Sequence, residues 1–73
     1  MAVHLIPIFA TVALTIDIPE EHLKRGQVGI VVEHLESDDD EPAELVEFDD
    51  ASGEVSTMAL VDPEYLVLVA VAT

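Results

Sequence analysis

The sequence predicts a single all-β domain in which five short strands close into a small barrel. Hydrophobic residues make up 51% of the 73 residues and lie in short runs rich in valine and leucine. Pro, Gly, Asp and Ser separate these runs, which is typical of strands joined by turns. A chain of this length holds one hydrophobic core, and because it has no cysteine its stability depends on packing and oligomerisation.

The apolar runs place the strands. An apolar arm over residues 1–8 precedes the barrel domain, residues 9–73. The expected strands cover residues 9–15, 28–35, 44–49, 54–61 and 66–71. In the second run, alternation puts Val28, Ile30 and Val32 in the core and Glu33 outside. The last run is apolar throughout, which predicts a strand covered on both faces.

Residues 16–27, the first connection, predict one helical turn. Asp17 is expected to be its N-cap, Pro19 to begin it, and Gly26 to end it in a left-handed conformation. Gly29, inside the second strand, predicts that another backbone or a large side chain approaches closely there.

The later connections are short and polar. Residues 37–42, "SDDDEP", form an acidic loop, and residues 50–53, "DASG", form a hairpin turn closed by a left-handed Gly53. Residues 62–65, "DPEY", predict a 3₁₀ turn before the last strand. Five strands with these connections predict an SH3-like barrel, whose closure removes exposed edges.

Two resemblances follow from these blocks. "LKRGQVGIVV" and "ALVDPEYLVLV" resemble the second strand and the closing strand of small SH3-like barrels, including the ribosomal KOW type. In addition, "VALTIDIPEEHLKRGQVGIVVEHL", "AELVEFDDASGE" and "ALVDPEYLVLV" together resemble the bacterial domain-of-unknown-function family 4926 over residues 12–68. This resemblance implies no activity and transfers no catalytic or binding residue.

The charge of the chain excludes several kinds of partner. Sixteen acidic residues stand against two basic ones, a formal net charge of −14. Nucleic acids and anionic membranes bind proteins through Lys and Arg, so neither is an expected partner. The acids are expected on the surface and in loops. Lys24 and Arg25, the two basic residues, are expected to relieve acidic repulsion near Asp17 and to approach the loop at residues 37–41.

No apolar run reaches the roughly 20 residues that a membrane span needs. The apolar N-terminal segment has no Lys or Arg before it and is interrupted by Pro7, which disfavours a signal peptide. We therefore expect a cytoplasmic protein.

Candidate sites for metal ions are weak. His4, His22 and His34 are scattered over arm, connection and strand, whereas zinc needs converging ligands. The acidic loop at residues 37–42 lacks the ligand spacing of a calcium-binding loop. We expect no metal or cofactor, although cation binding by this loop is left open.

Catalysis is not expected either. The chain has no cysteine, and Ser37, Ser52 and Ser56 have no nearby histidine in sequence. Gly26 and Gly29 lack the Lys and Ser/Thr of a phosphate-binding loop. Polyproline recognition requires a groove of aromatic residues, whereas this chain has no Trp and a single Tyr, Tyr65. The sequence therefore predicts no catalytic, cofactor-binding or metal-binding residue.

Surplus apolar residues at the two ends favour protein binding. They exceed what a small barrel can enclose: Val3, Leu5, Ile6, Ile8, Phe9, Val67, Val69 and Val71. We expect a homodimer, or a docking surface for another protein, formed by the arm and the last strand. The favoured function is an acidic protein–protein interaction module, an adaptor or regulatory subunit. The alternative is an antitoxin or immunity-type inhibitor of a basic nucleic-acid-binding or nuclease partner, drawn in by charge.

Overall fold

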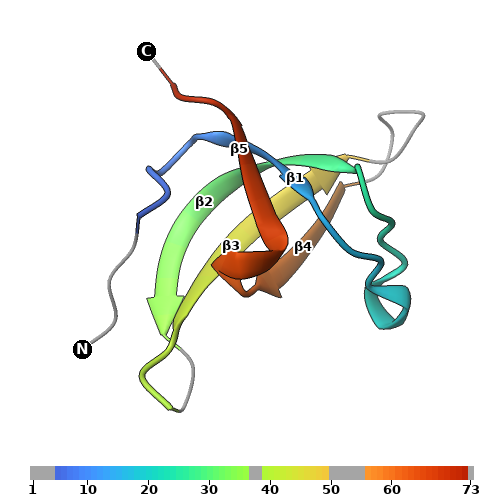
Figure 1. The fold of residues 1–73 in the computed structure, drawn as a ribbon, viewed down its shortest axis with the longest axis horizontal. Helices are drawn as coiled ribbons and strands as arrows, with labels where there is room; N and C mark the ends of the chain where they lie inside the picture. The colour runs from blue at the N-terminus through green and yellow to red at the C-terminus, as the bar shows by residue number, and fades with distance from the viewer. Residues whose placement is uncertain (1–4, 37–38, 50–55, 73) are drawn as a thin grey trace.

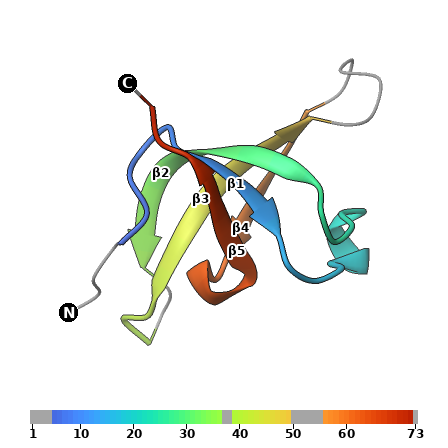
Figure 2. The ribbon, with the colours of Figure 1, turned by 45° about the horizontal axis from the view of Figure 1, so that its top comes forward.

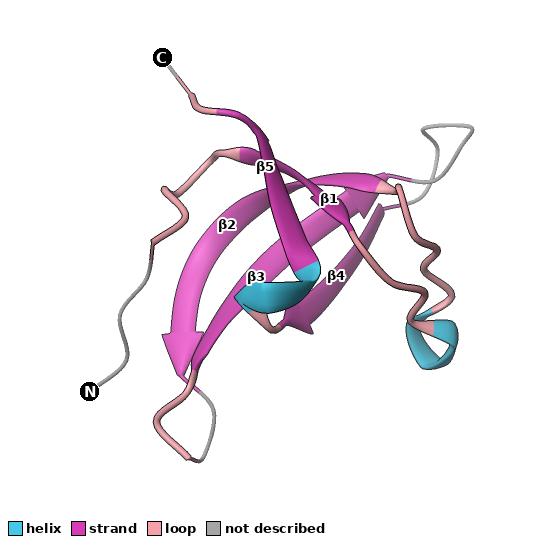
Figure 3. Cartoon of the chain, viewed as in Figure 1, coloured by secondary structure: helices cyan, strands magenta, loops and turns pink. Residues whose placement is uncertain are grey.

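The fold is all-β, as expected, and consists of five strands and two 3₁₀ turns (Figures 1 and 3). The computed structural model describes residues 5–36, 39–49 and 56–72. The strands are β1 (Thr11–Leu14), β2 (Val28–Glu36), β3 (Pro42–Asp49), β4 (Ser56–Val61) and β5 (Leu66–Ala70). The 3₁₀ turns are η1 (Pro19–Glu21) and η2 (Pro63–Tyr65), so the predicted turn before the last strand is confirmed.

The strands form one antiparallel sheet in the order β4-β3-β2-β1-β5. Long, curved β2 pairs with β1 on one side and β3 on the other (Figure 2). Among the described residues no pairing joins β4 to β5, so these strands are the two edges of the sheet.

One face of the sheet carries the core. Its buried side chains come from all five strands and from the first connection: Val12, Leu14, Leu23, Val31, Val46, Phe48, Ala59, Val61 and Leu66. Ile6, Ile8 and Ile18 pack against this cluster while partly exposed. Burial of these side chains is the main stabilising contribution, at about 25 cal/mol per Å² of apolar surface.

The face assignment expected for β2 is wrong. Val31 is fully buried, whereas Val28 is 49% exposed and Ile30 43%. The cause is a bulge, because Val31 pairs with Val46 but Glu33 pairs with Leu45, leaving Val32 as an extra residue. The extra residue reverses the inward–outward alternation of side chains. Strict alternation counted back from the exposed Glu33 therefore assigns the first half of β2 to the wrong face.

The two glycines of the "GQVG" stretch have the predicted backbone roles, except that η1 ends at His22 and not at Gly26. Gly26 has a φ of +89°, the left-handed conformation expected of it. A Cβ atom at Gly29 would lie 2.7 Å from the Glu47 carbonyl oxygen and 2.7 Å from Cδ1 of Phe48. Gly29 therefore allows β3 and the Phe48 ring to pack directly against β2.

The first connection differs from its prediction at the cap. Ile18, rather than Asp17, is the N-cap of η1. The Asp17 carboxylate instead accepts a hydrogen bond from the Arg25 backbone N–H at 2.8 Å, which ties the two ends of the connection together. His22 follows η1 in a left-handed conformation.

Strand bounds also shift slightly. Phe9 has a φ of +69°, so extended structure begins only at Thr11. The predicted turn at residues 50–53 lies outside the described residues. The expectation that β5 is covered on both faces is wrong for this chain, because only Leu66 of its five residues is buried. None of the helices in the described part is long and apolar enough to cross a membrane.

Candidate functional site

β5 exposes four apolar residues out of its five. It lies at the edge of the sheet and, within the described part of the chain, pairs with β1 alone. Val67 is 50% exposed and Val69 58%, and Leu68, on the opposite face from Val67, is 48% exposed. An unpaired edge with apolar side chains on both faces is a template for binding another chain.

The outer face of the sheet continues this surface. Register places Val28 of β2 and Val67 of β5 on either side of Ala13 of β1, all on the face opposite the core. Ile30 lies in the next row, opposite Thr11. We call Val28, Ala13 and Val67 the outer row. It is an apolar strip that crosses three strands.

A groove lies on the other side of β5. We call it the edge groove. It has a volume of about 460 Å³ and is lined by Leu5, Ile6, Pro42, Asp62, Pro63, Glu64, Leu66 and Leu68. Four of these side chains come from the arm and β5 and are leucine or isoleucine. The described end of the arm and β5 therefore line the same groove.

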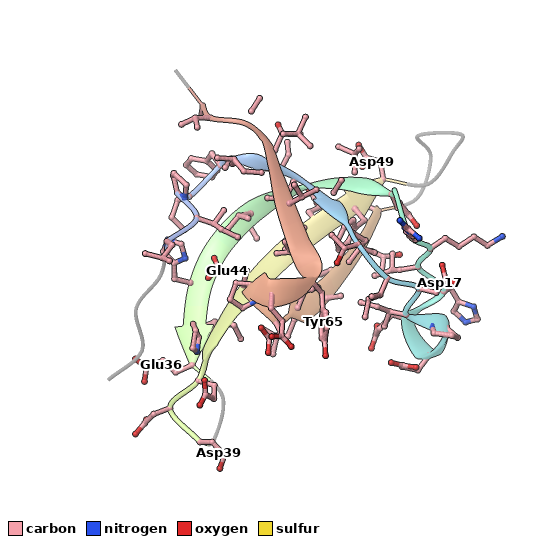
Figure 4. All side chains as sticks on the ribbon, in the orientation of Figure 1. Asp17, Glu36, Asp39, Glu44, Asp49 and Tyr65 are labelled. Carbon is pink, nitrogen blue, oxygen red and sulfur yellow. The ribbon has the colours of Figure 1, made fainter. Side chains whose placement is uncertain are left out.

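Acidic side chains border one end of the edge groove. Asp62 accepts a hydrogen bond from the Glu64 backbone N–H at 3.0 Å, which caps η2 and holds the Asp62 carboxylate in place. Tyr65 lies at the end of η2 (Figure 4). Glu64, and to a smaller extent Asp62, raises the pKa of the Tyr65 phenol above its usual value because phenolate would form beside carboxylates.

A buried acid lies under this end of the sheet. Glu44 of β3 is fully buried, which corrects the expectation that acids lie only on the surface and in loops. His34 of β2 lies directly opposite it, with Nδ1 2.7 Å from Oε2 of Glu44. The bulge at Val32 brings them together, because it turns His34 to the core face while Glu33 points outward.

Sequence reasoning missed this pair. Alternation along β3 from Val46 and Phe48 places Glu44 on the core face, so the sequence did contain a signal for its burial. No sequence signal indicated the bulge that turns His34 toward Glu44. The pair is enclosed by protein on the Glu44 side and partly open at His34, whose side chain is 27% exposed. We interpret it as a packing element of the core.

The other predicted residues do not gather into one site. His22 is exposed on the first connection, His34 lies on β2, and His4 lies outside the described residues. Among described residues no three His, Cys, Asp or Glu side chains come together as metal ligands. Of the three candidate serines, Ser56 begins β4 and is exposed, while Ser37 and Ser52 are not described.

Lys24 and Arg25 lie on the first connection and do not reach the acidic loop. Figure 4 places Asp17, which binds the Arg25 backbone, and Asp39 of the acidic loop at opposite ends of the molecule. The expectation that the two basic residues approach residues 37–41 is therefore wrong. Their proximity to Asp17 is confirmed through the backbone of Arg25.

Comparison with known proteins identifies the family. The chain matches the family model of DUF4926, a domain of unknown function, over residues 8–68, and it belongs to this family. This confirms the resemblance drawn from the sequence blocks and extends it by a few residues at the N-terminal side. No curated protein and no solved structure matches the chain.

Proposed function

We propose that this DUF4926 domain is a protein–protein interaction module, an adaptor or regulatory subunit without a catalytic site. The observation that carries the proposal is β5, an edge strand whose residues after Leu66 are all exposed and all apolar. The outer row and the edge groove extend apolar surface to both sides of it. Removal of such an apolar surface from water by a partner would favour association.

In finer detail, we propose that the sheet is a partly open SH3-like barrel whose opening lies beside β5. The order β4-β3-β2-β1-β5 with η2 before the last strand agrees with such a barrel. The edge groove then lies at the opening between β5 and the start of β3. A partner seated there would complete the wall of the barrel.

Capture of the natural partner tests the proposal. Full-length bait with Val67→Lys and Val69→Lys is compared with wild type and with a control, Met58→Lys and Leu60→Lys. The control residues are similarly exposed and lie on β4, the opposite edge of the sheet. Each variant adds two lysines, so both change the net charge equally. We expect loss of partner with the β5 variant alone, at unchanged melting temperature. Loss with the β4 variant alone would place the docking surface on β4 and overturn the proposal.

A homodimer through the same surface is one form of this function. Size-exclusion chromatography with light scattering on the intact chain tests it. Dimerisation that the β5 variant abolishes supports a homodimer, whereas a monomer at micromolar concentration rules that form out and leaves a heterologous partner.

A second candidate function is inhibition of a basic nucleic-acid-binding or nuclease protein. The net charge of −14 and the acids beside η2 favour it, because such charges speed association with a basic surface. Its association rate would fall steeply between low and physiological salt, whereas apolar docking would change little. Measurement of the association rate at both salt concentrations separates the two functions.

A further inference from the structure

We propose that the edge groove binds an extended segment of a basic protein as an added strand beside β5, with lysine or arginine at the end nearest η2. This inference rests on the proposed function and specifies its partner. It is carried by three features of the described residues: the direction of the backbone groups of β5, the apolar floor of the edge groove, and the acids at one end of it.

The backbone of β5 has hydrogen-bonding groups that point away from the sheet. Leu14 directs its own backbone groups to β2, because its N–H donates to the Gln27 carbonyl and its carbonyl accepts from Gly26 N–H. Leu14 and its partner Leu66 are therefore a pair without mutual hydrogen bonds. By alternation, the carbonyls of Leu66 and Leu68 and the N–H of Leu68 face the free edge. Leu66 N–H is taken by the Pro63 carbonyl.

These groups match what an added strand needs. A strand placed along Leu66–Leu68 can accept from Leu68 N–H and donate to the two carbonyls. The backbone groups of Val67 instead face Ala13 of β1, so an added strand would not bind them. The Val67 amide is therefore the control for the Leu68 amide. The bulge at Val69, where Thr11 pairs with Ala70 but Val12 pairs with Leu68, ends the regular ladder, so the added strand is short.

The floor of the edge groove selects apolar side chains. Leu5 and Ile6 of the arm line it together with Leu66 and Leu68 of β5. Alternate residues of an added strand point into the groove, and the residues between them point to solvent. Valine or isoleucine at alternate positions of the ligand would fill it.

The charge along β5 is asymmetric. Asp62 and Glu64 line the edge groove at the N-terminal end of β5, and Glu36 and Glu41 line an adjoining hollow that shares Pro42 and Asp62. Figure 4 shows Glu36 and Asp39 at this side of the molecule. Glu64 and Asp62 also raise the pKa of the Tyr65 phenol above its usual value. No basic residue lines the described part of either hollow.

This asymmetry identifies the occupant and its direction. A second copy of the chain would bring its own net charge of −14 to the same acids, so charge disfavours it. A basic segment is complementary. Antiparallel pairing is the more stable arrangement, and it places the C-terminal end of the ligand beside η2. The segment would therefore carry its Lys or Arg after its apolar residues.

Two synthetic peptides of equal composition test this with the full chain. The first is acetyl-Thr-Val-Thr-Val-Thr-Lys-Arg-amide, and the second has the reversed order, with Arg-Lys first. Isothermal titration and amide hydrogen exchange by NMR provide the readouts. We expect saturable binding of the first peptide, at least about fivefold weaker binding of the second, and slowed exchange at Leu68 but not at Val67.

Charge variants of the protein complete the test. Asp62→Asn with Glu64→Gln should weaken binding about tenfold at low salt, from two exposed ion pairs. Asn can still cap η2, so the turn is retained. The control Glu20→Gln with Glu21→Gln removes the same charge from η1 and should leave the dissociation constant unchanged.

Several results would overturn the inference. They are absence of binding below millimolar peptide, equal binding of both peptides, or unchanged exchange at Leu68. Self-association that protects Leu68 in the absence of peptide would identify a second copy as the occupant. If the peptides fail while partner capture still depends on Val67 and Val69, the proposed function stands and only the chemistry of the partner is wrong.

Discussion

β2 and β5 are both rich in valine, yet the fold treats them differently. β2 lies inside the sheet with partners on both sides, and its Gly29 and Val31 pack against β3. β5 has one partner among the described strands, and its residues after Leu66 are exposed. Apolar composition alone therefore does not decide burial. The number of neighbouring strands and the face that a bulge selects decide it, which separates the strand that stabilises the fold from the strand available to a partner.

The largest expected effect lies at the closest packing of β2. Gly29→Ala should lower the free energy of unfolding by about 3 kcal/mol, because its Cβ would meet a backbone carbonyl and a buried ring that cannot both move away. Urea unfolding followed by circular dichroism measures this. Gly26→Ala is the control: no atom obstructs it, and its left-handed φ should cost about 1–2 kcal/mol. A smaller loss at Gly29 than at Gly26 would contradict the close approach.

A series of Val→Ala changes tests which faces are buried. At Val31 the loss should be about 2 kcal/mol, from two methyl groups and the cavity that they leave. At Val28, on the outer face of the same strand, it should be below about 1 kcal/mol, and at Val69 of β5 below about 0.5 kcal/mol. The same unfolding measurement applies. A larger loss at Val28 than at Val31 would restore the face assignment expected without the bulge.

The next largest loss of stability is expected on breaking the contact between His34 and the buried side chain of Glu44. His34→Ala should destabilise the protein by about 1–2 kcal/mol, because it removes a hydrogen-bond partner from a buried group while partial exposure of the site lets water enter. A double-mutant cycle with Glu44→Gln should give a coupling energy of about 1 kcal/mol. Additive effects of the two changes would show that the pair contributes nothing specific.

The smallest effect concerns the acidic end of β5. Tyr65 is the only Tyr in a chain without Trp, so absorbance near 295 nm reports its ionisation alone. We expect a titration midpoint above 10, since Glu64 and Asp62 oppose the phenolate, and a lower midpoint in Glu64→Gln. Glu20→Gln, with the same charge change on η1, should leave the midpoint unaltered.

The raised pKa of Tyr65 also predicts how the free energy of unfolding changes with pH. Above the usual phenol pKa, the unfolded state loses its Tyr65 proton before the folded state does, so this group makes stability fall as pH rises through that window. Addition of 1 M salt should bring the folded midpoint closer to the usual value, because the carboxylates are exposed and screened. A midpoint that does not respond to salt or to Glu64→Gln would mean that the acids beside η2 create no local field.

The sequence by itself determined the features that local chemistry controls. Alternating apolar runs predicted five strands, Gly26 predicted a left-handed turn, and the "DPEY" segment predicted the 3₁₀ turn before β5, since each depends on the intrinsic preferences of a few neighbouring residues. Gly29 likewise signalled a close approach, although which atoms approach it depends on β3.

Only the tertiary structure decided which faces are buried and which edge is free. The bulge at Val32 arises from pairing with β3, and it reverses the first half of β2 and joins His34 to Glu44. The exposure of β5 arises because β1 is its only described partner. Both depend on contacts between segments distant in sequence, and the period of a strand pattern carries no information about an extra residue or a missing neighbour.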